Sequence, residues 1–219
     1  MDLSSTIYET STRPCKRVYA ITQMVYKDAK LYVSGMSNEE FASSLWTFAY
    51  PFNDAVSATS VEVFHGAHGS YETHAPIRTF LPYQINDKDQ LLAAYACTPL
   101  VTIDMAQLKD KAHVKGRTIA ELGAGNGPID IIGYQFDGED KILLSNNRQP
   151  LMSFTAKNLD AYKGSMTKRA SSYTEGIAFD KVKAKGVLEL SNFNADYVLT
   201  TTKKANGELA LTALSKAQL

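Results

Sequence analysis

The strongest constraint on the fold of this chain is a stretch of sequence that occurs twice. The segment PIRTFLPYQINDKDQLLAAYACTPLVTI (Pro76–Ile103) aligns with PIDIIGYQFDGEDKILLSNNRQPLMSF (Pro128–Phe154) after a one-residue gap. In that register Tyr83 and Tyr134 lie 51 residues apart, and a looser copy occupies Ile21–Phe48. A fixed period of this kind is typical of folds that stack one supersecondary unit on the next.

Each unit of the repeat has the pattern of β-strands. The runs KLYVSGM, QLLAAYAC and DKILLSNN are short, apolar and bounded by turn residues, among them Asn86-Asp87 and Asp137-Gly138. Such runs predict strands that are joined by hairpins. Pro76 and Pro128 stand where strands would begin, which is a position at which a strand tolerates proline. Helical periodicity is sparse, so we predict an all-β fold.

Units of about fifty residues with four antiparallel strands each resemble the blades of a β-propeller. The resemblance covers most of the chain but lacks the signature dipeptides of the common blade families. Propellers close with about four to eight blades, so about four blades imply a partial propeller. Missing blades or a second copy of the chain, as a homo-oligomer, would complete the ring. The implied boundaries are 1–16 for an N-terminal extension, 17–219 for a single propeller-like domain, and 17–70, 71–122, 123–175 and a degenerate 176–219 for the blades.

Composition narrows the classes of function. Lys plus Arg and Asp plus Glu both number 23, so the formal net charge is zero and no basic field predicts nucleic-acid binding. No apolar run is long enough for a membrane span. The N-terminus lacks the apolar core of a signal peptide, and the location stays open: periplasmic or secreted if a signal peptide precedes Met1, and cytoplasmic otherwise. Cys15 and Cys97 permit one disulfide but imply none.

The segment FHGAHGSYETHAPIRTF (Phe64–Phe80) holds three of the four histidines. Imidazole and carboxylate groups suit zinc, iron or copper, so the candidate cofactor is a divalent metal. The spacing matches none of the strong zinc signatures, and two alternatives stay open: a polar or anionic ligand, or histidines that only form hydrogen bonds within a loop. The candidate metal ligands are His65, His68, Glu72 and His74.

The same segment belongs to a predicted loop-rich face. In a four-stranded meander, the loop between the second and third strands leaves at the same end as the connection to the next unit. The segment 65–74, the turn 122–128 and the loops at Cys97-Thr98 and 146–149 would therefore gather together. By analogy with propellers, a ligand site is expected there. The candidate ligand-binding residues are Arg78, Asp130, Asn146, Asn147 and Arg148. Arg78 and Asp130 could instead form an ion pair between blades.

The run RTIAELGAGNGPIDII (Arg117–Ile132) is similar to the first motif of S-adenosylmethionine-dependent methyltransferases. That resemblance implies that Glu121 and the glycines at 123, 125 and 127 hold the cofactor and that a helix follows. However, Pro128 and the apolar residues after it predict a strand. The glycines would then form a flexible turn between two units.

Three functions remain as expectations. The first is a ligand-binding or protein-interaction propeller scaffold, whose small-molecule or protein ligand the sequence does not identify. The second is a metal-dependent propeller enzyme, either a hydrolase or an oxidoreductase, that uses the histidine-rich segment. The third is a methyltransferase.

Overall fold

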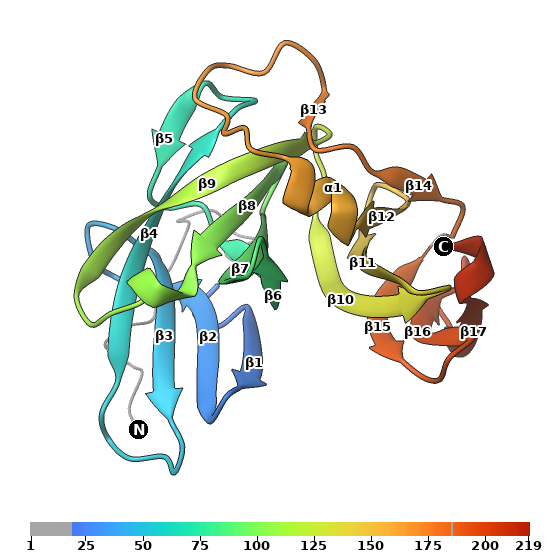
Figure 1. Ribbon diagram of the computed structural model, residues 1–219, viewed down its shortest axis with the longest axis horizontal. Coiled ribbons are helices and arrows are strands. Elements are labelled where there is room, and N and C mark those ends of the chain that lie inside the picture. The colour runs from blue at the N-terminus through green and yellow to red at the C-terminus, as the bar shows by residue number, and fades with distance from the viewer. Residues whose placement is uncertain (1–18, 185) are drawn as a thin grey trace.

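The computed structural model describes residues 19–184 and 186–219, and β-sheet dominates its regular structure (Figure 1). The predicted all-β class is confirmed. None of the helices in this part of the chain has the length and apolar character that a bilayer-spanning helix requires. The strands are β1 (Gln23–Lys27), β2 (Lys30–Met36), β3 (Ser43–Ala49), β4 (Ser57–His65), β5 (Ser70–Glu72), β6 (Ile77–Ile85), β7 (Lys88–Tyr95), β8 (Pro99–Asp104), β9 (Ala112–Leu122), β10 (Pro128–Phe136), β11 (Glu139–Asn146), β12 (Leu151–Thr155), β13 (Thr174–Gly176), β14 (Asp180–Val182), β15 (Val187–Asn192), β16 (Tyr197–Lys203) and β17 (Leu209–Ser215). The helices are α1 (Ala156–Ala161) and the 3-10 helices η2 (Met105–Gln107) and η3 (Lys216–Gln218).

The hairpins lie where the turn residues predict them. Asn86 and Asp87 have φ of 50° and 58° and join β6 to β7, whereas Asp137 and Gly138 have φ of 51° and 73° and join β10 to β11. Positive φ at both central residues is the geometry of the tight turn that matches the twist of paired strands. Both hairpins consequently have closely similar registers, with the strand pairs continuous up to the turn.

The first nine strands form one curled sheet. Its strands follow the order β1-β2-β3-β4-β9-β8-β7-β6, with β5 added to β4 and β13 added to β9. Neighbours are antiparallel except β4 and β9, which run parallel. The sheet curls until its end strands meet, where the side chain of Gln23 on β1 accepts a hydrogen bond from the backbone N–H of Phe80 on β6. The result is a nearly closed barrel.

The inside of this barrel is apolar. Side chains from β2, β3, β4 and β6 to β9 meet in one core, among them Tyr32, Phe80, Leu91, Tyr95 and Val101, all of which are buried. Apolar residues alternate with the outward-facing ones along each strand, as the pleat requires. This core fixes the ends of β4, β8 and β9 relative to one another.

The predicted propeller is wrong, and so is the division into blades. The predicted blades 17–70 and 71–122 belong to a single ten-stranded sheet, because parallel pairing from Thr59–Ala112 to Val63–Gly116 joins β4 to β9. Propeller blades are separate sheets around a channel. The similarity of the two aligned segments is enough to specify their hairpins. The pairing of β4 with β9 depends on long-range contacts, which the 51-residue spacing of the repeat does not encode.

Two smaller sheets complete the molecule (Figure 1). The sheet β10-β11-β12-β14 packs against the outer face of β6 to β9, and Leu159 of α1 is buried in the apolar layer between them. The three-stranded sheet β15-β16-β17 packs on the far side of β10 to β12, through Tyr134, Leu143 and Val198. The predicted N-terminal extension, residues 1–16, and Cys15 lie outside the described residues; Cys97 is a free thiol.

Candidate functional site

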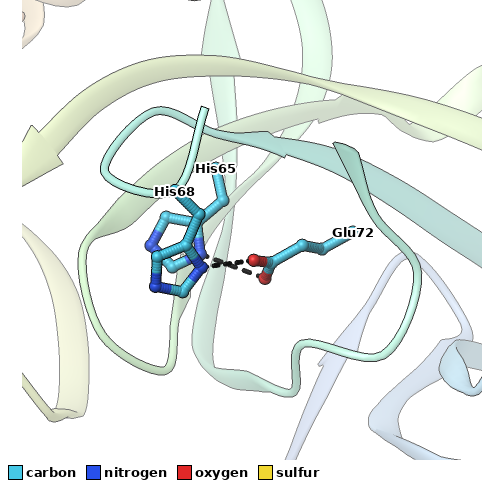
Figure 2. Close-up of side chains that lie close together, drawn as sticks. All are labelled: His65, His68 and Glu72. Carbon is cyan, nitrogen blue, oxygen red and sulfur yellow. Dashed lines mark hydrogen bonds and ion pairs between the residues drawn. The ribbon is translucent and has the colours of Figure 1, made fainter. Parts of the chain in front are cut away.

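Three of the predicted metal ligands meet at the end of β4. The strand ends at His65, whose carbonyl oxygen accepts hydrogen bonds from the N–H groups of His68 and Gly69. The chain then returns along β5, which ends at Glu72 and is paired antiparallel with β4. Gly69 has a φ of 73°, a conformation that glycine adopts without strain. This short hairpin places both imidazoles beside the Glu72 carboxylate, as Figure 2 shows.

The cluster is compact and asymmetric. The Nδ1 atom of His65 lies 3.0 Å from one carboxylate oxygen of Glu72, and the Nδ1 atom of His68 lies 2.5 Å from the other. The two imidazole rings are 3.8 Å apart between centroids. The side chain of His65 is only 2 % exposed and that of Glu72 20 %, whereas that of His68 is 56 % exposed. One histidine therefore anchors the cluster inside the protein and the other faces solvent.

The histidines keep the Glu72 carboxyl ionised. Partial burial alone would raise the pKa of Glu72, but the hydrogen bonds from His65 and His68 and the attraction of their rings outweigh burial and lower the pKa to about 2. At neutral pH the carboxylate therefore accepts from both Nδ1–H groups. An ionised carboxylate is also the form that binds a metal ion.

A second layer of buried polar contacts holds His65 in place. The Nε2 atom of His65 lies 2.8 Å from the hydroxyl oxygen of Thr98, the residue before β8, and both residues are 1 % exposed. The next residue, Gly66, donates its N–H to the Oε1 atom of Glu121 on β9 at 2.6 Å. A Cβ atom at position 66 would lie 2.9 Å from Oε1 of Glu121, so a larger residue there would have to displace that carboxylate.

The donor set is one that suits a borderline transition metal. One donor atom from each of His65, His68 and Glu72 lies within 4.8 Å of the others. Two imidazoles and a carboxylate form a common three-residue ligand set for zinc, with ligand distances of about 2.0–2.2 Å.

The fourth predicted ligand, His74, and the cysteine Cys97 lie outside this cluster. His74 is exposed, and its Nδ1 atom contacts the hydroxyl oxygen of Thr73 at 3.1 Å. It lies two residues beyond the end of β5 and is thereby separated from the hairpin. Cys97 is partly buried and has a φ of 79°, but it does not join the three ligands.

The structure does not pair Arg78 with Asp130. The guanidinium of Arg78 lies over the ring of Tyr19, 5.1 Å from its centroid. Asp130 accepts hydrogen bonds from the backbone N–H groups of Ile131 at 2.9 Å and Leu190 at 2.8 Å. Burial raises the pKa of Asp130 by more than these two bonds lower it. Asp130 thus ties β10 to β15 and also borders a groove of about 580 Å³ beside these strands.

In the polar loop at the end of β11, the Asn146 side chain forms hydrogen bonds to the backbone. Asn146 donates through its side-chain amide to the carbonyl oxygens of Leu144 and Pro150. Asn147 and Arg148 are exposed, and the Asn147 side chain lies against Gly127. Their predicted role in ligand binding stays a prediction.

The methyltransferase hypothesis is wrong. The required helix after Gly127 is replaced by β10, which begins at Pro128 and continues to Phe136. The turn before it has φ values of 114° at Gly123 and 69° at Gly125, which glycine adopts readily. Glu121 of this motif binds the Gly66 N–H instead of a cofactor.

The hydrogen bond between His65 and Thr98 and the contact of Glu121 with Gly66 were not predicted from the sequence. A signal for Glu121 was present, because a carboxylate that stands inside an apolar strand run, TIAEL, has to find a partner when the strand is buried. All of Ile119, Ala120, Glu121 and Leu122 are at most 1 % exposed.

Comparison with known proteins gives little further guidance. No protein-family model matches the chain, and no curated protein matches it. Among solved structures, the chain is similar to the catalytic domain of a GH62 alpha-L-arabinofuranosidase from Coprinopsis cinerea, with a TM-score of 0.44 and 9 % identity over 98 % of this chain and 73 % of that one. A similarity of this size carries no argument about activity. The predicted propeller scaffold and propeller metalloenzyme are both wrong, because the sheets do not form blades.

Proposed function

We propose that the protein binds a divalent transition-metal ion of the zinc class through His65, His68 and Glu72. The observation that carries this proposal is the convergence of three donor atoms within 4.8 Å, one of them on a fully buried histidine. Because His65 is already held in one conformation by burial, metal binding has less side-chain entropy to remove. The exposed His68 side chain leaves the ion a route from solvent.

The hydrogen bond to Thr98 supports a specific protonation state in the metal-bound form. A histidine that binds a metal usually donates its other ring N–H to an oxygen, which sets the tautomer. In His65 the Nε2 atom faces the Thr98 hydroxyl oxygen at 2.8 Å, so Nε2–H can donate there. The Nδ1 lone pair then points toward Glu72, where the ion would lie. Binding would displace the Nδ1 protons that bridge the histidines to Glu72.

Calorimetric titration of the protein, after dialysis against EDTA, tests the proposal. We expect Zn²⁺ to bind with a stoichiometry of one and Mg²⁺ to bind far more weakly, because Mg²⁺ prefers oxygen ligands. His68→Ala removes an exposed ligand and should weaken Zn²⁺ binding by more than about tenfold. His74→Ala is the matched control, because it removes an exposed histidine outside the cluster.

Two results would contradict the proposal. The first is a folded wild-type protein that takes up no Zn²⁺ at millimolar concentrations. The second is an equal loss of affinity in His68→Ala and His74→Ala, which would place the binding elsewhere. In either case the cluster would be a hydrogen-bonded group of structural residues.

A further inference from the structure

A groove of about 500 Å³ lies away from the His65–His68–Glu72 cluster. Its walls come from β6, β10 and the loop after β15, and Asn192 closes it by donating a hydrogen bond to the carbonyl oxygen of Gly133 at 2.7 Å. Pockets that hold small ligands typically enclose roughly 300–1,000 Å³. The groove shares no lining residue with the His65–His68–Glu72 cluster.

The main chemical feature of this groove is a buried lysine. Lys216 lines the groove and is only 5 % exposed. Its ammonium donates to the carbonyl oxygen of Gln135 at 3.2 Å and lies 5.9 Å from the centre of the Tyr134 ring. Among residues 19–184 and 186–219, no carboxylate forms an ion pair with it. A buried charge without an opposite charge is costly, so the groove would attract an anion.

The remaining lining residues restrict what that anion can be. Tyr83 and the 62 % exposed Phe193 present aromatic surface, which packs well against another ring. Asp140 also lines the groove, and its carboxylate would repel a second negative charge but accept a hydrogen bond from a hydroxyl. The side-chain oxygen of Asn194 already accepts from the N–H groups of Asp196 and Tyr197, so its amide N–H₂ remains as a donor.

We propose that this groove binds a small ring-bearing organic carboxylate. The ligand's single carboxylate pairs with Lys216, its ring packs against Tyr83 and Phe193, and a ring hydroxyl donates to Asp140. The buried lysine selects for the charge, and the Asp140 carboxylate selects against dicarboxylates.

Amide NMR titration with two matched probes tests this assignment. Para-hydroxybenzoate and para-hydroxybenzamide have nearly the same shape, but only the first is an anion. We expect saturable shift changes around Lys216 and Phe193 with the benzoate at millimolar concentrations, and binding of the benzamide roughly tenfold weaker or absent. Equal binding of both probes, or no saturable binding of the benzoate, would overturn the proposal.

Two variants assign the binding to the groove. Lys216→Met removes the ammonium group and keeps a linear side chain one atom shorter, so the preference for the benzoate should disappear. The melting temperature of the variant reports whether the fold survives. Phe193→Ala removes an exposed ring and should weaken benzoate binding several-fold without unfolding the protein. Phe52→Ala, which removes a ring that is 58 % exposed and lies outside the groove, should change nothing. Undiminished benzoate binding in both Lys216→Met and Phe193→Ala would refute the site.

Discussion

Replacement of Thr98 by valine isolates the hydrogen bond that holds His65. Threonine and valine have almost the same shape, so the substitution deletes one hydroxyl and leaves the packing in place. The deleted oxygen lies 2.8 Å from the Nε2 atom of His65, and both residues are 1 % exposed. Water cannot replace the lost partner without rearrangement. The imidazole nitrogen is therefore left buried and without a hydrogen bond.

The expected cost follows from that orphaned group. A buried polar atom that loses its partner destabilises the folded state by about 1–3 kcal/mol. Urea unfolding of Thr98→Val in the presence of EDTA should show a loss of unfolding free energy in this range. The same variant should bind Zn²⁺ about 10–100-fold more weakly in calorimetry, because the residue that orients a metal-binding histidine is lost.

Thr79→Val provides the matched control. The Thr79 side chain is 0 % exposed, and its hydroxyl has no hydrogen-bond partner among the described residues. The same chemical change there removes an unsatisfied hydroxyl, so the unfolding free energy should stay constant or rise. If Thr98→Val and Thr79→Val change the unfolding free energy equally, the hydrogen bond to His65 contributes nothing specific and the reasoning fails.

Two further predictions concern the barrel core and the side chain of Tyr83. Gly116→Ala should lower the unfolding free energy by about 1–3 kcal/mol, because the added Cβ would lie 2.5 Å from Cγ1 of Val101 in the barrel core. An unchanged urea midpoint would contradict this prediction. Burial, with the charges of Asp140 and Asp160, raises the pKa of Tyr83 to about 12. Asp140→Asn should therefore lower the Tyr83 pKa in a carbon NMR titration, and an unchanged or higher value would count against the assigned cause.

Features that depend on residues close together in the sequence could be predicted from the local sequence pattern. The hairpins at Asn86-Asp87 and Asp137-Gly138 follow from turn residues that tolerate positive φ. The short separation of His65, His68 and Glu72 likewise confines them to one turn and its flanking strands. His74 shares the composition of this segment but lies past the end of β5, and composition alone cannot locate the residue at which a strand stops.

The parallel pairing of β4 with β9 explains both the failure of the propeller prediction and the construction of the candidate site. It merges two units that the 51-residue register treats as separate. It also brings the end of β4 to β9 and its neighbour β8, where Gly66 meets Glu121 and His65 meets Thr98. Both contacts join residues more than thirty positions apart, and each requires the barrel to curl as it does. A chain of separate blades would have kept the three candidate ligands in their hairpin but would have left His65 without its buried partners. The support of the candidate site is thus a property of the tertiary fold, which explains why the sequence pointed to the candidate ligands but not to the residues that hold them in place.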